Sequence, residues 1–548
     1  DYRQALEDNQ KSLRLAEELG YKHLEAYVLQ NMGDNYLKLA QYASALEFAE
    51  RSSTLAHSSE LGDIYWRART TAGQARLALG QIDLAREDLR EAISAIEKLR
   101  GQVAGGEQDL SLFFADKVSP YYSMVDLLVA QSKPFEALTF AERAKGRVLL
   151  DVLSSTRSRV TKGMTVDEVE RDHGLTAEMK TLSTQLSRLK LQDKPDEAQV
   201  AALTGRLEQA RRDYESFQTN LYILHPELKV QRGQTRPLTP DEARALLPDG
   251  QTALLEYAIS EDKLYLFVMT SGAGQTRDSA VNLTVHPLHV TAGELAELAK
   301  SFRRGVAERD LMIKGPARRL YDLLIAPAES RLRGIKKLCI VPDGSLWELP
   351  FQALYHDGQG YLLERYAIYY APSLSVLREM NRRGAQLKAA HDRQNPNAAV
   401  GPRAKADGAP QTRADLLALG NPSLSDWTKA KAVPVRGDGA LAPLPDAERE
   451  VKALGQLYGA NKSRVLTGPG AREEVVKSEA GGYLILHFAT HAILDDNNPM
   501  YSYIMLSHAT GEDGLLEAGE IARLDLNAEM VVLSGCQTAR GRVAAGEG

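Results

Sequence analysis

Cysteine is scarce in this chain: among 548 residues there are two, Cys339 and Cys536. Two cysteines cannot build the disulfide framework that stabilises small secreted domains. So low a cysteine content is typical of proteins in a reducing compartment. We therefore expect a cytoplasmic protein.

Long apolar runs and an excess of basic charge are also missing. No uninterrupted apolar run approaches the ~20 residues that span a bilayer, and the formal net charge is −6. Neither nucleic acid nor an anionic membrane surface is therefore expected as a direct partner. The composition leaves the oligomeric state open.

Both ends of the sequence look cut. The chain begins at Asp1, within a predicted helix, and stops at "AAGEG". We expect it to be a fragment of a longer protein, so the lack of a signal peptide does not bear on its targeting.

Helical periodicity repeats at a fixed interval in the N-terminal part. The segments "DYRQALEDNQKSL", "QYASALEFAERSS" and "QIDLAREDLREAI" place Ala5, Ala45 and Ala85 at intervals of 40 residues, and Gly33 and Gly73 have the same spacing. A small residue at a recurring position lets two antiparallel helices approach closely. A fixed period is typical of a stacked helical array.

These segments resemble tetratricopeptide repeats. The stretch "NMGDNYLKLAQYASALEFAERS" supplies the Gly, Tyr, Tyr and Ala of that pattern at Gly33, Tyr36, Tyr42 and Ala45. A fourth helical pair is predicted around Pro134, which would begin its second helix. We predict an antiparallel helical array over residues 1–155, with an ordinary helical bundle as the alternative.

Residues 156–234 are predicted to form a helical hairpin that links the repeats to the rest of the chain. One apolar stripe contains Met179, Leu182, Leu186 and Leu189, and a second contains Val200, Leu203, Leu207 and Tyr214. Pro195 breaks the helix between them. A dimerising coiled coil is the alternative.

Strands alternate with helices in the C-terminal part, residues 235–548. "TALLEYAI" and "KLYLFVMT" predict a β-hairpin, and residues 383–412 are predicted to be a mobile loop. The runs "DLLALGNP", "SRVLTGPG", "YLILHFATH" and "EMVVLSGCQ" follow, with helical stretches between them. This pattern indicates an α/β domain with a mostly parallel sheet that is covered by helices on both faces.

Two of these apolar strands end in reactive residues, His491 and Cys536. Ligands bind outside the carboxyl ends of the strands in open parallel sheets, so two strands can bring an imidazole and a thiol to one edge. A thiol needs a neighbouring base or cation to become a thiolate near neutral pH. Histidine can serve as that base and can then protonate a leaving amine.

The surrounding residues resemble CHAT, a caspase-like peptidase domain that accompanies tetratricopeptide repeats. The resemblance rests on "HFATHAILDDNNPMYSYIMLS", "LSGCQTARG", "LCIVPDGSLWELPFQALYHDGQGYLLERYAIYYAPSLSVL" and "LPDAEREVKAL". It implies that His491 is the general base and Cys536 the nucleophile, with the N–H groups of Ala492 and Cys536 as oxyanion donors. The family usually has glycine where this chain has Ala492, and it continues beyond Gly548.

Other residues near these strands carry weaker expectations. Asp495 and Asp496 are candidates for a pocket that accepts a basic substrate side chain, with a solvated loop as the alternative. His487 is expected in the core or as a support for His491. Cys339 is expected to be buried and inert. No third ligand recurs near the histidines, so we expect no metal site, and no cofactor is implied.

The sequence therefore predicts helical repeats joined to a caspase-like cysteine endopeptidase. It would cleave a specific protein substrate through a thioester acyl-enzyme, and the repeats would bind a protein partner or regulate the peptidase. The alternative is a catalytically inactive scaffold in which both parts serve protein interaction.

Overall fold

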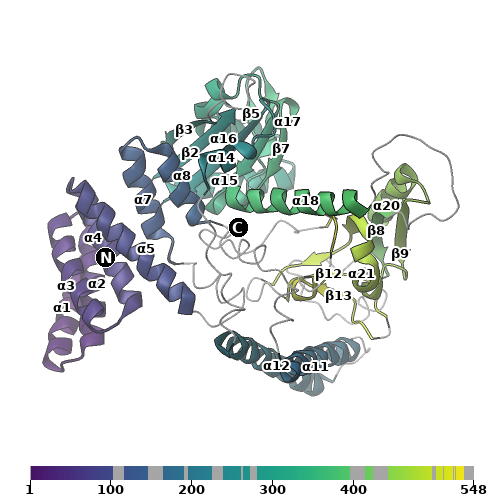
Figure 1. Ribbon diagram of the computed structural model, residues 1–548, viewed down its shortest axis with the longest axis horizontal. Coiled ribbons are helices and arrows are strands. Elements are labelled where there is room, and N and C mark those ends of the chain that lie inside the picture. Colours follow the sequence, from purple (N-terminus) through teal and green to yellow (C-terminus); the bar gives the residue numbers. More distant parts are fainter. Residues whose placement is uncertain are drawn as a thin grey trace. The chain divides into compact units, whose positions relative to one another are not determined.

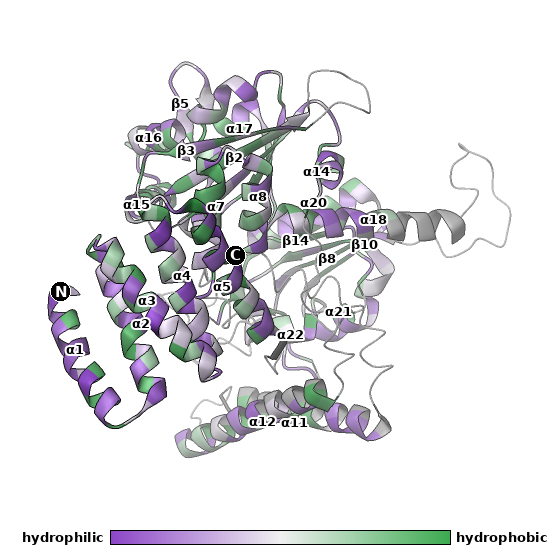
Figure 2. Ribbon diagram, turned by 60° about the vertical axis from the view of Figure 1, so that its left-hand side comes forward, coloured by the Kyte–Doolittle hydropathy of each residue, from purple (hydrophilic) through white to green (hydrophobic). Residues whose placement is uncertain are grey.

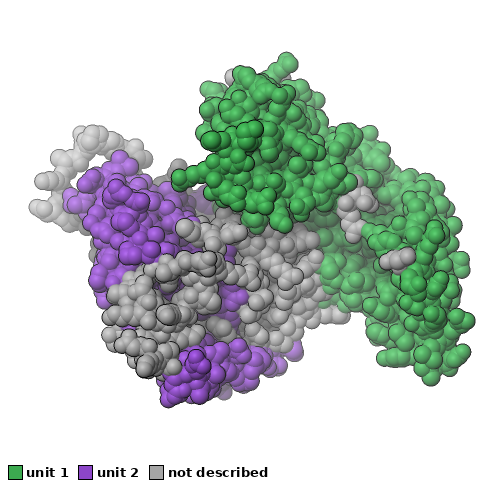
Figure 3. All heavy atoms as spheres, turned by 180° about the vertical axis from the view of Figure 1, so that it is seen from behind, with its two compact units in different colours: residues 1–157, 229–380, 543–548 green, residues 158–228, 381–542 purple. Residues whose placement is uncertain are grey.

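The computed structural model describes residues 2–102, 116–145, 165–190, 196–224, 238–260, 263–271, 281–394, 414–423, 442–495, 501–509, 511–521, 524 and 526–535. The chain divides into two compact units (Figure 3). The first contains residues 1–157, 229–380 and 543–548, and the second contains residues 158–228 and 381–542. Both expected domain boundaries, at residues 155 and 234, lie outside the described residues.

The first unit starts with a helical array (Figure 1). Its described helices are α1 (Tyr2–Glu18), α2 (Lys22–Lys38), α3 (Tyr42–Ser58), α4 (Gly62–Ala78), α5 (Ile82–Gln102), α7 (Ser119–Ala130) and α8 (Pro134–Arg143). Hydrophobic and hydrophilic stretches share each helix, as Figure 2 shows for α1 and α2. The predicted helical array is confirmed, including the start of α8 at Pro134.

The turns of the array recur at intervals of 20 residues. Gly20, Ala40, Glu60 and Gly80 all have a positive φ, between 56° and 75°. After each of them, the next amide donates to a carbonyl five residues back, as Tyr21 does to Ala16 at 3.0 Å. This left-handed ending satisfies carbonyls that the last helical turn leaves unpaired. The helices therefore end every 20 residues, which is half of the 40-residue period in the sequence.

The small residues of the 40-residue pattern meet where helices cross. A Cβ added at Gly33 would lie 3.4 Å from the carbonyl oxygen of Ala45, and one at Gly73 would lie 3.3 Å from that of Ala85. Ala45 and Ala85 are fully buried, whereas Ala5 is half-buried. The crossings of α2 with α3 and of α4 with α5 thus repeat the same close approach.

A five-stranded sheet follows the array in the first unit. Its strands are β1 (Thr252–Ile259), β2 (Leu264–Ser271), β3 (Val281–Leu288), β4 (Lys337–Val341) and β7 (Ala367–Tyr370), in the order β3-β2-β1-β4-β7. β1 pairs antiparallel with β2, which confirms the predicted hairpin, and parallel with β4. One face packs against α5, α7 and α8, and the other against α15 (Ala292–Glu308) and α16 (Lys314–Leu324).

Shorter elements complete the first unit. They are α14 (Pro240–Ala245), η1 (Ala326–Arg331), η2 (Gly344–Glu348), η3 (Phe351–Ala353), β5 (Tyr355–His356), β6 (Gly360–Tyr361) and α17 (Leu362–Arg365). Helix α18 (Leu374–Gln394) begins in this unit. It includes residues 383–394, which were expected in a mobile loop. That expectation was wrong for this stretch, because Gln, Leu, Lys and Ala in "AQLKAAHDRQ" favour helix; residues 395–412 lie outside the described residues.

Buried polar contacts join the array to the sheet within the first unit. Lys145, two residues after the end of α8, lies 3.1 Å from Glu256 on β1. The carboxylate of Glu142 accepts the N–H groups of Leu374 and Ser375 at 2.8 and 2.6 Å, at the start of α18. Because these groups are almost completely buried, their pairing fixes how α8 docks on the sheet.

The second unit contains the predicted helical hairpin. Its helices are α11 (Val166–Lys190) and α12 (Glu197–Leu224). Their contact buries apolar residues of both predicted stripes, namely Met179, Leu182, Leu186, Val200, Leu203 and Leu207. The predicted break at Pro195 lies outside the described residues.

A four-stranded sheet forms the other part of the second unit. Its strands are β8 (Ala414–Pro422), β9 (Ser463–Gly468), β10 (Tyr483–Ala489) and β14 (Met530–Leu533), all parallel, in the order β14-β10-β8-β9. Side chains alternate between two cores: Leu416 and Ala418 pack under α20 (Pro445–Tyr458). Leu417 and Leu419 pack under α21 (Glu473–Glu479). The predicted parallel sheet with helices on both faces is confirmed.

A small antiparallel sheet follows β10 in the chain. It consists of β11 (Ala492–Ile493), β12 (Tyr503–Met505) and β13 (Leu515–Glu517); η4 (Ala480–Gly482) and α22 (Ala518–Ile521) are the remaining short helices. In the first unit, β1, β2, β3, β4 and β7 form a separate, mixed sheet, because the β1–β2–β3 meander adds antiparallel strands to it. β5 pairs antiparallel with β6 in a two-stranded sheet. Within the described ranges, no helix is both long and apolar enough to cross a bilayer.

Candidate active site

The two strands that precede His491 and Cys536 are neighbours. β10 and β14 pair in parallel from Ile485–Met530 to Phe488–Leu533, so each pair is separated by 45 residues in the sequence. The N–H of Ser534 extends the pairing by donating to the carbonyl of Phe488 at 2.8 Å. The same spacing of 45 residues separates His491 from Cys536.

His491 lies just beyond the end of β10. Its Nε2 atom lies 2.9 Å from the carbonyl oxygen of Ala442, and its own carbonyl accepts the N–H of Met505 at 2.9 Å. The hydroxyl of the preceding Thr490 donates to the carbonyl of Met505 at 2.5 Å. The backbone and the ring of His491 are therefore both held by neighbouring main-chain groups.

Ala492 begins β11 and is paired with Ile504 on β12. Because the N–H of Met505 donates to His491, Ala492 occupies a non-hydrogen-bonded position of this antiparallel pair. Its N–H consequently points away from β12.

Other predicted site residues are only partly described. Cys536 and Asp496 lie outside the described residues. Asp495 is half-buried, and its N–H donates to the hydroxyl of Ser502 at 3.1 Å. Cys339 is fully buried on β4, and burial raises the pKa of its thiol to about 12, which makes it a poor nucleophile at neutral pH.

Helix α20 packs closely on the strand ends because of Gly420. A Cβ at Gly420 would lie 2.7 Å from Cγ2 of Val451 and 2.9 Å from the carbonyl oxygen of Ala447. The next residue, Asn421, has a φ of 46°. Its side chain accepts the N–H of Leu444 and donates to Glu448, both at 2.8 Å. The end of β8 therefore fixes the start of α20.

One carboxylate of α20 contacts the ends of both β10 and β14. Oε1 of Glu450 lies 2.9 Å from Nε2 of His487, and Oε2 accepts the hydroxyl of Ser534 at 3.2 Å. His487 is buried, and its neighbours Ile485 and Ala489 on the same face of β10 pack under α20. Thus His487 contacts Glu450 in the structure.

The sequence prediction missed the residues of α20 and the end of β8. "LPDAEREVKAL" was recognised as a helix and as part of the CHAT resemblance, but Ala442, Glu450 and Asn421 were not singled out. One signal was available: Ala447, Val451 and Leu454 form an apolar stripe at helical spacing, and Glu450 lies beside it.

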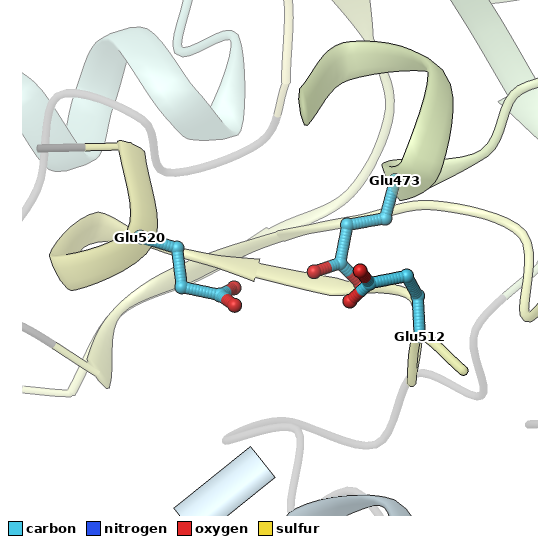
Figure 4. A group of neighbouring side chains, drawn as sticks. All are labelled: Glu473, Glu512 and Glu520. Carbon is cyan, nitrogen blue, oxygen red and sulfur yellow. The ribbon is translucent and has the colours of Figure 1, made fainter. Parts of the chain in front are cut away.

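Among the described residues, one group of carboxylates is close enough to hold a metal ion. Oxygen atoms of Glu473, Glu512 and Glu520 all lie within 4.8 Å of one another. Figure 4 shows the carboxyl groups of Glu473 and Glu512 facing each other, with that of Glu520 directed toward them. The ammonium group of Lys477 contacts all three, at 3.0 Å from Glu512 and 2.5 Å from Glu520. Lys477 therefore supplies the positive charge at this position.

The charges of this group are unbalanced, because three carboxylates share one ammonium. Burial raises the pKa of Glu473 to about 8, and the negative charge of Glu520 adds to this effect. Burial opposes the charge of Lys477, but its contacts with Glu473 and Glu520 raise its pKa above the ordinary value. Glu473 is consequently the member of the group that binds a proton near neutral pH.

Comparison with known proteins agrees with this architecture. Residues 314–548 match the CHAT domain family. Tetratricopeptide repeat protein 28 from Homo sapiens is 26% identical over 312 residues, which cover 50% of this chain and 11% of that protein. The protein of the same name from Mus musculus is 28% identical over 275 residues, which cover 43% of this chain and 10% of that protein.

The chain spans about a tenth of the length of these curated relatives. Their name refers to the repeats, and the matched family corresponds to the C-terminal part of this chain. The chain therefore combines a helical array of the tetratricopeptide-repeat type with a CHAT domain, which belongs to the caspase-like peptidase superfamily.

Proposed function

We propose that the chain is a cysteine endopeptidase that cleaves a specific protein substrate, with His491 as general base and Cys536 as nucleophile. The observation that carries the proposal is the register of β10 and β14. These parallel neighbours pair with an offset of 45 residues, and His491 and Cys536 have the same offset. Adjacent strands lie ~4.8 Å apart, so groups that leave their ends can meet.

The contact of His491 with Ala442 sets the tautomer of the imidazole. A carbonyl oxygen can only accept a hydrogen bond, so Nε2, at 2.9 Å, carries the proton. In the neutral ring, Nδ1 then has the free lone pair and can accept the proton of a thiol. The backbone carbonyl thereby orients the imidazole of His491, as a carboxylate does in other peptidases.

The reaction proceeds in two acyl-transfer steps. His491 takes the proton of the Cys536 thiol, and the thiolate attacks the scissile carbonyl carbon. The N–H groups of Ala492 and Cys536 stabilise the oxyanion. As the C–N bond breaks, His491 gives its proton to the leaving amine, which leaves a thioester. His491 then deprotonates a water molecule that attacks the thioester carbonyl carbon. The C–S bond breaks, the product leaves as a carboxylic acid, and the Cys536 sulfur regains its proton from His491.

Substrate choice is assigned to groups beside the reacting centre and to the repeats. Asp495 and Asp496 follow His491 closely and would favour a basic side chain before the cleaved bond. If Asp495→Asn and Asp496→Asn together leave the cleavage preference unchanged, this assignment is wrong. The helical array would bind a protein partner or regulate the peptidase, and cytoplasm is the proposed location.

A second candidate is a catalytically inactive scaffold. It is favoured by the relatives, whose name refers to repeats and to no enzymatic activity, and by Ala492 in place of the family's usual glycine. In that case the array and the CHAT domain would both serve protein interaction.

One experiment separates the two candidates. A peptidyl electrophile that reacts with activated thiols, such as a peptidyl acyloxymethyl ketone library, should modify Cys536 of the native protein. The reaction should be abolished by Cys536→Ala and nearly abolished by His491→Ala, since members of a nucleophile–base unit fail together. A scaffold would show no selective reaction at Cys536, and His491→Ala would leave its labelling unchanged.

A further inference from the structure

The carboxylate of Glu450 links two strand ends at the candidate active site. It is in α20, and its two oxygens contact His487 on β10 at 2.9 Å and Ser534 after β14 at 3.2 Å. We infer that Glu450 is a positioning residue, which sets the spacing between the segment that leads to His491 and the segment that leads to Cys536. This inference rests on the proposed peptidase function.

The two residues that contact Glu450 lie close in the sequence to the proposed catalytic residues. Ser534 precedes Cys536 by two residues, and His487 precedes His491 by four. Each strand is stiffened by its backbone pairing up to Phe488 and Ser534. At the end of this paired segment, Glu450 adds a side-chain link between the two strands from the face covered by α20.

The contacts are strongest with a carboxylate, because hydrogen bonds to a charged acceptor are stronger than those to a neutral one. Ser534 donates its hydroxyl proton to one oxygen, and the His487 ring donates an N–H to the other, so Glu450 acts as a double acceptor. An amide could still accept from His487 and donate its NH₂ group to the oxygen of the Ser534 hydroxyl, which can act as an acceptor. Both hydrogen bonds would then lack the negative charge that strengthens them. Glutamine therefore keeps the size of the side chain and weakens both links.

Ser534 and His487 do not form a catalytic pair of their own. Glu450 lies between them, so the hydroxyl of Ser534 contacts a carboxylate and no imidazole nitrogen in the described structure. His487 is buried on the sheet, whereas a general base must reach a substrate. The geometry thus supports a holding role for Glu450 and leaves the chemistry to the residues at the strand ends.

The position of Glu450 is itself fixed by α20. Asn421 holds the N-terminal end of the helix through Leu444 and Glu448, and the same segment supplies the Ala442 carbonyl to His491. The N-terminal half of α20 therefore contacts the ends of β8, β10 and β14. A shift of this helix would therefore move groups that contact all three strand ends.

The test measures alkylation of Cys536 by iodoacetamide in the full chain as a function of pH. Cys339 is fully buried, so its alkylation would report unfolding, and mass spectrometry separates the two sites. If Glu450 positions the thiol against His491, Glu450→Gln should lower the rate at pH 7 about tenfold, the size expected when hydrogen bonds to a charged group become hydrogen bonds to a neutral one. The inflection of the pH profile should also move toward that of a free thiol.

Two further variants sharpen the result. Glu474→Gln changes an exposed glutamate of α21 in the same unit, which contacts Arg472, and should leave the rate unchanged. Ser534→Ala should lower the rate, and adding it to Glu450→Gln should cause little further loss, because both act through one link. Circular dichroism and thermal unfolding should show that all variants remain folded.

The outcomes distinguish this inference from the proposed function. A wild-type profile with the inflection of an ordinary thiol, near pH ~8.5, would overturn both. A depressed inflection in the wild type that Glu450→Gln leaves unchanged would overturn the role of Glu450 alone. Fully additive losses in Glu450→Gln and Ser534→Ala would likewise refute a shared link.

Discussion

The Nε2 atom of His491 lies 2.9 Å from the carbonyl oxygen of Ala442. Ala442 stands three residues before α20, and Asn421 at the end of β8 holds the start of that helix. The orientation of the imidazole therefore depends on how closely α20 packs on the sheet. This dependence leads to the first prediction.

Gly420→Ala should destabilise the second unit and displace α20. The new Cβ would lie 2.9 Å from the Ala447 carbonyl, a backbone atom that cannot rotate away. Overpacking of this kind costs about 1–3 kcal/mol. Urea unfolding followed by circular dichroism measures the loss, and the rate of Cys536 alkylation should fall with it. Gly482→Ala is the control, since no atom lies within 4 Å of its added Cβ; equal effects of the two changes would contradict the prediction.

Gly73→Ala should destabilise the repeat array by about 1–3 kcal/mol. The added Cβ would lie 2.9 Å from Cγ of Leu89 and 3.3 Å from the carbonyl oxygen of Ala85, at the crossing of α4 with α5. Gly205→Ala in α12 meets no atom within 4 Å and should instead stabilise by up to about 1 kcal/mol through helix propensity. We expect Gly73→Ala to lower the unfolding temperature and Gly205→Ala to raise it. A stabilised Gly73→Ala variant would show that the crossing of α4 with α5 can accommodate a methyl group.

The repeat period shows how much of this fold the sequence could predict. Ala45, Ala85 and their glycine partners recur every 40 residues, so local propensity and packing agree, and the helices were found correctly. The left-handed turns at Ala40 and Glu60 were not foreseen, because neither residue type favours a positive φ. There the stacking of the helices determines the turn.

The candidate site was predicted only as far as its strands. The pairing of β10 with β14 follows from two apolar runs that end in reactive residues. Ala442, Glu450 and Asn421 lie 37 to 70 residues from His487 or His491 in the chain, and their roles depend on how α20 is placed on the sheet. Hydropathy predicts that the helix covers the sheet, but it does not predict which polar residue on its border meets the strand ends.

Lys145→Met should destabilise the first unit by about 3–5 kcal/mol, because it leaves Glu256 without its cation in a dry core. The two side chains lie 3.1 Å apart and are 2% and 1% exposed. Burial already raises the pKa of Glu256 well above its usual range, against the pull of Lys145. Replacing both, as Lys145→Met with Glu256→Leu, should restore most of the stability. Denaturant unfolding of the four proteins gives the coupling, and purely additive losses would argue against a paired contact.

The Glu473 group should make the second unit less stable as the pH rises. Glu473 has an ordinary pKa of 4.5 and a pKa of about 8 in the folded protein, so the folded state binds its proton more tightly than the unfolded state between these values. The free energy of unfolding should therefore fall as pH rises from about 4.5 to 8.

Hydrogen exchange of amides in α21, corrected for the intrinsic exchange rate, measures this local stability at pH 5.5 and pH 8. The protection of α21 should decrease between the two values in the wild type. Glu473→Gln carries no proton to lose, so its protection should change much less over the same range, whereas the exposed Glu474→Gln should behave like the wild type. Other buried carboxyls, such as Glu256, act equally in all three proteins and cancel in the comparison. If Glu473→Gln lost protection as steeply as the wild type, Glu473 would already be ionised at pH 5.5, and Lys477 would be holding it as a carboxylate.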